Sequence, residues 1–414
     1  MNDPAKSPLL SFAEARHLVE QHASRLAATS PEFVNMLDAV GLALAEDLRA
    51  DRDFPPFPRA TRDGYAVCAA DVQAVPAKLR CIGMIKAGSA PEEDEITLLS
   101  GQAVEIMTGA PVPAGADAVV MVEHTEVAEE VVTVKRPVHA GENVVAAGAE
   151  ARRSDVMVPK GTRINHVVVA VAAALGRPEL AVHRRPLVAV LATGDELVDI
   201  NLPPGRNEIR NSNSFSLAAQ VHQAGGEPVI LPVARDEAAE IALLLRKGLQ
   251  SELLLLTGGV SMGKYDLVEE VLASLGAEFF FTGVAIQPGK PVVFGQLTLE
   301  GKTTPLFGLP GNPVSTMVTF QLFVKPVLDA LGGANIAPLL FGQAELKQPF
   351  TTKTGLTRFL PARLGGSTPK PEVEWVRWQG SGDLMSVVKS NCYIVVPHDR
   401  DRLNAGETVT VLLV

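Results

Sequence analysis

The chain has 414 residues, of which 47% are hydrophobic and 20% charged, so its composition excludes global disorder and its length predicts several domains of about 150 residues each. The formal net charge of -10 excludes the broad basic surface that nucleic-acid binding requires. The three cysteines are widely spaced, no signal-peptide pattern is seen, and no apolar run reaches the roughly 18 residues of a membrane span, so we expect a cytoplasmic protein without membrane contact.

The first predicted domain is split in the sequence. Ser11 and Glu14 form a capping-box pattern at the start of a helix, which is predicted to end near Ala28. A second segment with a helical pattern occurs later in the chain, where Asn165 is placed to cap another helix. We therefore expect residues 1–50 and 146–184 to form one discontinuous α/β domain.

A small β domain is predicted between these two parts. Short apolar runs alternate with glycine and proline turns, which is typical of β structure, and we expect the inserted domain to span residues 51–145. Thr108 lies beside a glycine turn, so its hydroxyl group is a candidate for chemistry. On spacing alone, an ordinary turn threonine is the simpler interpretation.

The third predicted domain, residues 185–335, alternates strands with helices. Apolar strands are expected at 187–191, 228–233, 253–256 and 306–309. Such alternation predicts a mainly parallel sheet between layers of helices, and right-handed crossovers bring the loops after the strands to one edge. The remaining segment, residues 336–414, lacks a long helical pattern and predicts a small β barrel or sandwich.

A glycine-rich loop follows the central strand of this third domain. Gly258, Gly259 and Gly263 let backbone N–H groups approach a bound anion. The same stretch matches a nucleophile elbow, with Ser261 as the nucleophile and His398 as the base that follows it in hydrolase order. A hydrolase is therefore an alternative interpretation, although an elbow normally enters its helix directly.

Charged residues are also predicted at the loop edge. The four carboxylates there are Asp195, Glu196, Asp236 and Asp266. Carboxylates combined with phosphate oxygens suit Mg²⁺, but Asp236 and Asp266 also stand where helix N-caps stand, so both interpretations stay open. Lys290 lies in a loop stiffened by two prolines, where its ammonium group could face an oxyanion or simply solvent.

Six motifs occur in a characteristic order: DGYAV at 63–67, MTGAPVP at 107–113, TGDEL at 193–197, GGVSMGKYD at 258–266, QPGKP at 287–291 and LPGNPVS at 309–315. Together they resemble the molybdopterin molybdenumtransferase family, which includes bacterial MoeA and the E domain of gephyrin. The resemblance implies a multidomain α/β protein. Its parts would be a three-layer α/β/α molybdopterin-binding domain with a mainly parallel sheet, an inserted small β domain, a discontinuous α/β domain and a C-terminal β barrel.

The resemblance also implies a reaction and partners. The reaction is the insertion of molybdate into adenylylated molybdopterin, with Mg²⁺, releasing AMP and molybdenum cofactor. The implied partners are a second copy of the chain in a homodimer, a molybdopterin adenylyltransferase, and recipient molybdenum enzymes or their chaperones. A molybdopterin adenylyltransferase-like enzyme and a non-catalytic gephyrin-like scaffold are the alternatives. The additional domains disfavour the adenylyltransferase. A gephyrin-like scaffold would be expected to carry a fused adenylyltransferase domain and a long linker, and neither is seen in this sequence.

Residue roles follow from the matching motifs. The resemblance implies catalytic roles for Asp63, Thr108, Glu196, Asp236, Asp266 and Lys290, with Glu196, Asp236 and Asp266 at the metal. Asp63 and Thr108 would face the site from the partner subunit. The implied substrate-binding residues are Thr193, Gly194, Gly258, Gly259, Ser261, Gly263, Pro288, Gly289, Pro310, Gly311, Asn312, Pro313 and Ser381.

Overall fold

The computed structural model describes residues 9–88, 96–259 and 267–414, which form two compact units. The first unit takes in the described residues up to Glu46 together with Lys160–Val169 and Pro178–Val414. The second unit comprises Asp47–Pro159 and Ala170–Arg177. Each unit has its own sheets and its own hydrophobic core, so the chain has the multidomain α/β fold that the sequence predicts.

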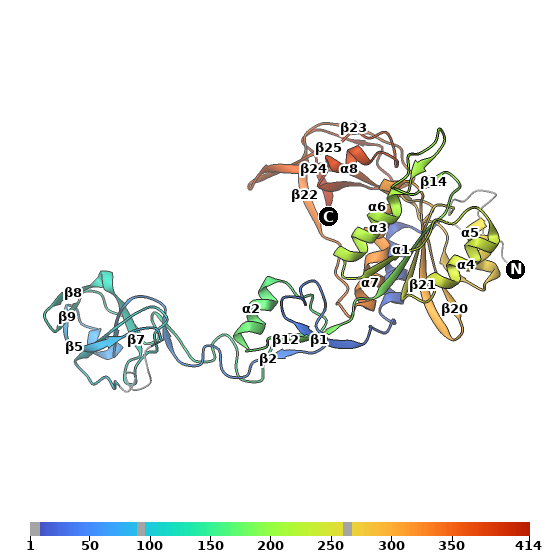
Figure 1. Ribbon diagram of the computed structural model, residues 1–414. Helices are drawn as coiled ribbons and strands as arrows, with labels where there is room; N and C mark the ends of the chain where they lie inside the picture. The colour runs from blue at the N-terminus through green and yellow to red at the C-terminus, as the bar shows by residue number, and fades with distance from the viewer. Residues whose placement is uncertain (1–8, 89–95, 260–266) are drawn as a thin grey trace. The chain divides into compact units, whose positions relative to one another are not determined.

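A six-stranded sheet with the order β16-β13-β17-β21-β20-β18 organises the first unit (Figure 1). Its strands are β13 (Leu187–Ala192), β16 (Glu227–Ile230), β17 (Leu253–Thr257), β18 (Glu278–Phe281), β20 (Val293–Leu299) and β21 (Lys302–Leu309). Neighbours among β16, β13, β17 and β21 are parallel, whereas β20 and β18 pair antiparallel at one edge. Every residue of β17 is buried, because parallel strands in the middle of such a sheet are covered on both faces.

Helices cover both faces of this sheet and make three layers. Alternate strand residues face opposite layers: Val188 and Leu253 pack in one core, and Ala189 and Leu254 in the other. The first core is completed by α1 (Phe12–Ala23), α3 (Ser212–Gln223), α6 (Pro313–Thr319) and α7 (Lys325–Leu331). The second core is completed by α4 (Ala238–Gly248) and α5 (Leu267–Ser274).

Helix α1 begins with the predicted capping box but is shorter than expected. The Ser11 side chain accepts from the backbone of Glu14, and the Glu14 side chain accepts from the backbone of Ser11. The helix ends at Ala23 and not near Ala28. A tertiary contact explains the difference, because the Thr29 amide donates to the Leu331 carbonyl at 2.9 Å and holds the chain extended there.

The helical stretch Pro313–Leu331 corrects the expectation that no apolar run reaches the length of a membrane span. It has 19 residues and a mean hydropathy of 1.3, and it combines α6, the π-helical turn η4 (Phe320–Val324) and α7. Within the apolar window, 78% of the residues are buried inside the protein. The helix is apolar because it packs in the first core, where Phe320 and Phe323 contribute its largest buried side chains.

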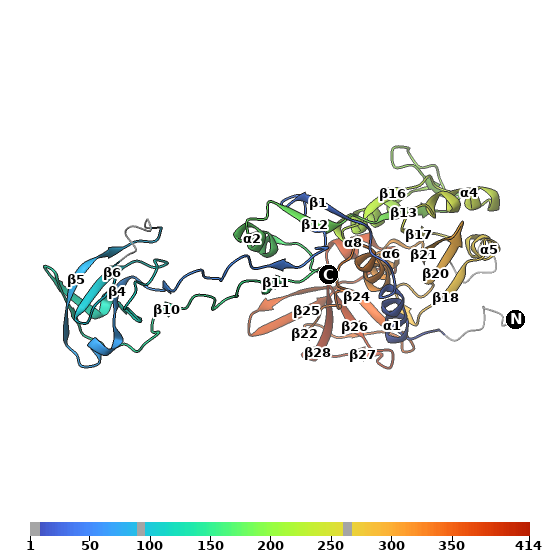
Figure 2. The same ribbon diagram turned by 90° about the horizontal axis from the view of Figure 1, so that it is seen from below.

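The C-terminal region of the first unit is a closed barrel, whose strands are the orange and red ones labelled in Figure 2. Its strands are β22 (Phe341–Leu346), β24 (Thr357–Ser367), β25 (Lys370–Trp375), β26 (Cys392–Val396) and β28 (Thr408–Leu413). Pairing of β24 with β26 closes the order β24-β25-β22-β28-β26 into a ring. The remaining short elements are β19 (Ile286–Gln287), β23 (Phe350–Thr351), α8 (Leu384–Val388) and β27 (Arg402–Leu403). The predicted C-terminal β barrel is therefore confirmed.

Short elements complete the first unit. Strand β1 (Pro31–Asn35) pairs antiparallel with β12 (Glu179–His183), and β14 (Leu197–Val198) pairs parallel with β15 (Ile209–Arg210). Helix α2 (His166–Ala174) begins in the first unit, and its residues from Ala170 onward belong to the second. It starts as predicted, because the Asn165 side chain accepts from the amides of Val167 and Val168.

The second unit is built on a six-stranded sheet with the order β7-β4-β6-β5-β9-β8. Its strands are β4 (Gly64–Val67), β5 (Ala77–Ile85), β6 (Gln102–Ile106), β7 (Ala118–Met121), β8 (Thr125–Ala128) and β9 (Val131–Val134). The shorter elements are β2 (Leu48–Arg49), β3 (Arg59–Ala60), η2 (Ala69–Val72), η3 (Val122–His124), β10 (Val144–Val145) and β11 (Val156–Val158). The β character predicted for this part of the chain is confirmed.

The environment of His22 predicts that the folded protein is sensitive to acid. Its ring centroid lies 4.9 Å from that of Phe280 and 5.2 Å from that of Phe294, and its buried Nε2 has no hydrogen-bond partner among the residues described. Burial lowers the pKa of His22 below its ordinary value of 6.5, and the positive charge of Arg25 lowers it further, while Glu278 opposes the shift. The folded state therefore binds fewer protons than the unfolded state, and the stability contribution is complete above pH 6.5 and declines as the pH falls below it.

We expect the wild type to have a lower melting temperature at pH 5.5 than at pH 7.5. The difference should be smaller in His22→Phe, because the phenylalanine does not titrate. Differential scanning calorimetry at several pH values measures the effect. His398→Phe, at an exposed histidine of the barrel, is the matched control. Equal acid sensitivity of the wild type and His22→Phe would contradict the assignment to His22.

Candidate functional site

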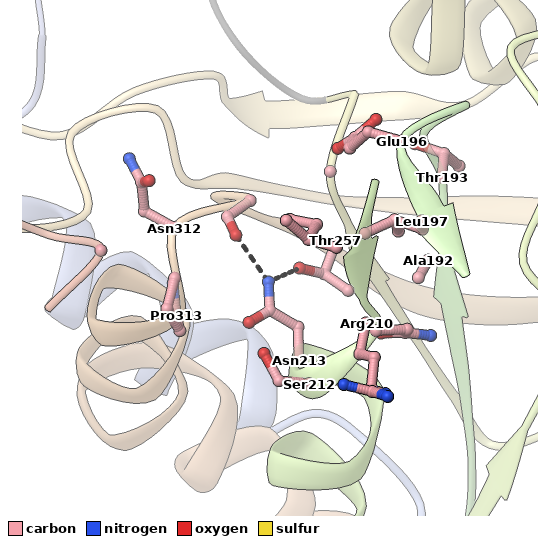
Figure 3. A pocket seen from close by; sticks show the side chains of 15 residues that line it. Ala192, Thr193, Glu196, Leu197, Arg210, Ser212, Asn213, Thr257, Asn312 and Pro313 are labelled. Atoms are coloured by element: carbon pink, nitrogen blue, oxygen red, sulfur yellow. Dashed lines mark hydrogen bonds between the residues drawn. The ribbon is translucent and has the colours of Figure 1, made fainter. Parts of the chain in front are cut away.

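The carboxyl ends of β13, β17 and β21 surround a cavity of about 330 Å³ (Figure 3). Residues in the segments 192–197, 209–213, 257–258 and 311–313 line it, together with Gly382. The loop after β16 joins the same edge, because Thr193 forms a bridge with Ala234 and the Gly194 amide donates to the Ala234 carbonyl at 3.2 Å. The structure thus places all four predicted loops at one sheet edge.

Close approach of two loops explains the glycines after β17. Gly258 and Gly259 have φ angles of +85° and +60°, in the left-handed region that favours glycine. A Cβ atom on Gly258 would lie 2.4 Å from the Thr193 carbonyl oxygen. Gly194 also has a positive φ, +142°, but a Cβ there would meet only the end of the flexible Glu196 side chain, at 2.4 Å. A larger residue at Gly258 would push the two loops apart.

Asn213 connects three segments of the cavity wall. Its Nδ2 donates to Thr257 Oγ1 at 3.0 Å and to the Gly311 carbonyl at 2.7 Å, and Figure 3 shows both bonds. Asn211 stands at the N-cap of α3 and accepts from the Ser214 amide, which directs the first turn of the helix toward the cavity. The amide of Asn213 therefore holds the ends of β17 and β21 against the start of α3.

Arg210 brings a positive charge to the same wall. Its Nε donates to the carbonyls of Ile200 and Leu202, both at 3.1 Å, and its Nη groups have no protein acceptor within the described chain. Sequence reasoning missed Arg210, Ser212, Asn213 and Thr257 as site residues. The only signal was the run of asparagine and serine at the head of a helix, and capping accounts for such a run without a ligand.

The carboxylates of the edge repel one another. Burial raises the pKa of Asp236, and the negative charges of Asp195 and Glu196 raise it further. Asp195 Oδ1 accepts from the Asp236 amide at 3.2 Å. The interpretation of Asp236 as a helix cap is wrong: α4 begins at Ala238, and Glu237 is at its N-cap. Asp236 therefore stays available to the hollow of about 370 Å³ that it lines next to Gly259.

The metal prediction can be compared with the structure only in part. The residues described contain no group of three or more histidine, cysteine or acidic side chains placed to hold a metal. Asp266, the third predicted metal ligand, lies outside the described residues, as do Ser261 and Gly263 of the glycine loop. Of the two residues in the nucleophile-elbow interpretation, Ser261 and His398, the structure describes only His398, which is an exposed residue of the barrel.

The Gln287–Lys290 loop does not line the cavity. Gly289 has a φ of +107°, and a Cβ there would lie 2.4 Å from Thr319 Cγ2, so the loop packs tightly on α6. Pro288 and Gly289 are buried, whereas Lys290 is exposed and its carbonyl accepts from the Val284 amide. The structure does not bring Lys290 together with Thr193 and Glu196 at the cavity wall.

The Pro310–Pro313 turn lies at the cavity and joins it to the barrel. Gly311, Asn312 and Pro313 line the cavity, and the Pro310 carbonyl accepts from Thr316 Oγ1 at 2.5 Å. Asn312 stands at the N-cap of α6 as predicted, but its side chain makes no capping bond. The Ser381 carbonyl accepts from the Val314 amide at 3.0 Å, which places Ser381 beside the start of α6.

Asp63 and Thr108 meet in the second unit. Asp63 Oδ1 accepts from both the amide and the hydroxyl group of Thr108, each at 2.7 Å. These two bonds hold the pKa of the Asp63 carboxyl below its usual value of 3.8. The two residues come from the start of β4 and from just after β6, which pair through Gly64 and Ile106. Asp63 thus fixes the direction of the Thr108 hydroxyl group.

Comparison with known proteins covers nearly the whole chain. Residues 10–176 match the family model described as MoeA N-terminal region (domain I and II), residues 189–330 match the probable molybdopterin binding domain, and residues 343–414 match the MoeA C-terminal region (domain IV). The described fold resembles a solved structure of a molybdopterin biosynthesis moeA protein from Pyrococcus horikoshii OT3, with a TM-score of 0.78 and 29% identity over 98% of this chain and all of that one.

Curated relatives agree with these matches. A molybdopterin molybdenumtransferase from Bacillus subtilis is 34% identical over 92% of this chain and 90% of its own length. Another from Staphylococcus epidermidis is 35% identical over the same shares, and one from Staphylococcus aureus is 33% identical over 99% of this chain and 96% of its own length. With this identity over nearly the full length, and with the glycine turns and acidic residues of the family motifs at one sheet edge, the chain belongs to the molybdopterin molybdenumtransferase family.

Proposed function

We propose that this protein inserts molybdate into adenylylated molybdopterin and releases AMP, in a Mg²⁺-dependent reaction within molybdenum cofactor biosynthesis. The observation that supports this most directly is the cavity that gathers Thr193 and Glu196 from the loop after β13, Asn213 from the start of α3 and Gly311 from the loop after β21. Such crevices outside the carboxyl ends of parallel strands are where open α/β sheets bind ligands. Membership in the family then favours a molybdopterin derivative as that ligand.

The cavity wall has both positively and negatively charged groups that suit a substrate with two phosphates. The backbone turns at Gly258 and Gly311 and the guanidinium group of Arg210 would contact phosphate oxygens. Glu196 and Asp236 would hold Mg²⁺, which commonly uses one or two carboxylates together with substrate phosphates. Burial raises the pKa of Asp236, and the negative charges of Asp195 and Glu196 raise it further, so a cation bound beside these carboxylates would relieve their repulsion. The bound ion would stabilise the charge that develops on the phosphate during cleavage.

The cleavage step has to release one proton. Cleavage of the phosphoanhydride consumes one water: its oxygen bonds to phosphorus, the bridging P–O bond breaks, AMP leaves, and the proton of the water passes to solvent. Asp236, as a ligand of Mg²⁺, would help to hold the ion that activates this water. Burial raises the pKa of Asp236 in the metal-free protein, and the charges of Asp195 and Glu196 raise it further, so turnover should fall as the medium becomes acidic enough for protons to compete with Mg²⁺ for this carboxylate.

The homodimer, the adenylyltransferase that supplies the substrate and the recipient enzymes belong to the same proposal, as does a role for Asp63 and Thr108 at a shared site. A molybdopterin adenylyltransferase-like enzyme is less well supported, because the family models also cover residues 10–176 and 343–414. A non-catalytic scaffold remains the alternative that the assay must separate.

The deciding experiment measures AMP release from adenylylated molybdopterin by anaerobically purified protein, with molybdate and Mg²⁺ each present or omitted. Release that requires both and yields active cofactor would establish the transferase. A protein that binds the substrate but releases no AMP under any condition would be a scaffold. Release without cofactor formation would indicate a hydrolase and exclude the transferase.

Glu196→Gln should raise the Mg²⁺ concentration for half-maximal turnover by about tenfold or more, because it removes one charged oxygen ligand while keeping the side-chain shape. Titration of AMP release against Mg²⁺ measures this. Asp199→Asn is the matched control, since it removes the same charge from an exposed residue of the same loop that does not line the cavity. Identical Mg²⁺ dependence of Glu196→Gln and the control would remove Glu196 from the metal site.

A further inference from the structure

The orientation of the Asn213 amide is determined by its partners. The Gly311 carbonyl can only accept a hydrogen bond, so the Asn213 atom at 2.7 Å from it must be the donor Nδ2. The same Nδ2 donates its second hydrogen to Thr257 Oγ1 at 3.0 Å. Both hydrogens of the amide are thereby used within the protein. A rotation that exchanged Oδ1 and Nδ2 would bring two carbonyl oxygens together and lose the bond to Gly311.

This arrangement leaves Oδ1 as an acceptor for the contents of the cavity. Asn213 is half-buried and lines the cavity, and no donor among the described residues reaches its Oδ1. The same cavity has a second unpaired group. Thr193 is 1% exposed, it lines the cavity, and its Oγ1 has no partner in the part of the chain that the structure describes. A buried hydroxyl group without a partner is rare in native proteins, so the Thr193 hydroxyl group is available to a water or a ligand in this cavity.

An acceptor oxygen at this position selects the chemistry of its partner. It attracts an N–H or O–H donor and repels a phosphate oxygen, so the Asn213 end of the cavity does not suit a phosphate. The Arg210 guanidinium and the glycine turns offer donors for the phosphates instead. A substrate with both phosphates and a nitrogen heterocycle would therefore place the heterocycle against Asn213.

We propose that Asn213 is a specificity-determining residue whose Oδ1 accepts a hydrogen bond from an amino or ring N–H group of the substrate's nitrogen heterocycle. The inference rests on the proposed function, because adenylylated molybdopterin has two heterocycles of this kind, adenine and the pterin. Both present N–H donors at a flat ring edge. Asn213 at the same time positions the loops after β17 and β21 through its two donated bonds.

The test is a set of anaerobic calorimetric titrations with AMP, with purine riboside 5′-monophosphate, which lacks only the adenine amino group, and with molybdopterin. The proteins are the wild type, Asn213→Ala, Asn213→Asp and Gln220→Glu. Gln220→Glu is the matched control for the aspartate variant, because it makes the same amide-to-acid change on the same helix at a side chain bonded only to the Ser216 carbonyl. Circular dichroism and melting temperatures confirm folding, and Asn213→Leu, which also lacks the acceptor oxygen, serves if the alanine variant does not fold.

If adenine is the partner, the wild type and Gln220→Glu should bind AMP about tenfold more tightly than the analogue. Asn213→Ala should lose that preference, while Asn213→Asp, which keeps an acceptor oxygen but no donor, should retain it. If the pterin is the partner, Asn213→Ala should bind molybdopterin about tenfold more weakly and AMP unchanged. Either selective result supports the proposal. A loss shared equally by all three ligands would indicate only a loop-positioning role and overturn it, as would unchanged binding of all three. Wild-type protein that binds none of the ligands would overturn the proposed function and this inference with it.

Discussion

Asp63→Asn should lower AMP release about 100-fold without disturbing the local fold. The carboxylate accepts two hydrogen bonds from Thr108 through one oxygen, and an asparagine Oδ1 can accept both in the same geometry. The substitution therefore removes the negative charge and little else. Initial rates of molybdate-dependent AMP release measure the effect, and circular dichroism checks that the second unit is folded.

Thr108→Val is the companion to this change. It removes the hydroxyl group that Asp63 orients but leaves the bond from the Thr108 amide, so a loss of comparable size would show that the two side chains act together. The hydrogen bonds from Thr108 lower the pKa of Asp63, so its charge is lost only as the pH falls below the usual value of 3.8. The pH dependence of turnover between pH 5 and pH 8 should therefore be the same for the wild type and Asp63→Asn. Wild-type rates in Asp63→Asn would exclude this residue from catalysis.

Gly64→Ala should destabilise the second unit by about 3 kcal/mol and lower its melting temperature by about 10 °C or more. Strand β4 lies between β6 and β7, and a Cβ on Gly64 would meet the Val120 carbonyl oxygen at 1.9 Å. The obstructing atoms belong to the backbone of a paired strand, so they cannot move aside as the end of a flexible side chain can. The sheet must separate locally to accept the methyl group. Calorimetric unfolding measures the change.

Gly83→Ala is the control for this prediction, because it adds the same methyl group to β5 of the same sheet. There the nearest atom is Ile96 Cδ1 at 3.4 Å, which lies at the end of a flexible side chain. We expect a change in unfolding free energy below about 1 kcal/mol. If both variants melt like the wild type, close packing at Gly64 is not a constraint on this sheet.

Much of the fold could be predicted because its signals are local. Four consecutive leucines with no polar residue among them indicate a strand buried on both faces, and β17 is such a strand. Ser11 and Glu14 form the capping box that their spacing predicts, and Asn165 caps its helix. Alternation of strands and helices also predicts the sheet edge where the loops gather.

The candidate site could be predicted only where its residues belong to recognisable motifs. Thr193, Glu196 and Gly311 carried such a signal, and the structure places all three at one cavity. Lys290 carried one too, but its side chain is exposed away from that cavity wall. Asp236 was interpreted partly as a cap, and the actual start of α4 at Ala238 shows that it has no capping role. The sequence pattern could not have placed the cap correctly, because the same local pattern is compatible with helix starts that differ by one or two residues.

The secondary-structure elements, the parallel core and the family could be predicted from short segments, because burial period, caps, glycine turns and motif order are properties of such segments. Which distant groups meet depends on the three-dimensional fold. The amide of Asn213 joins Thr257 and Gly311, and the hydroxyl of Thr108 points at Asp63, across 44, 98 and 45 residues of chain. No local pattern records such partners, since each hydrogen bond depends on the registers and crossovers that bring separate strands to a common edge.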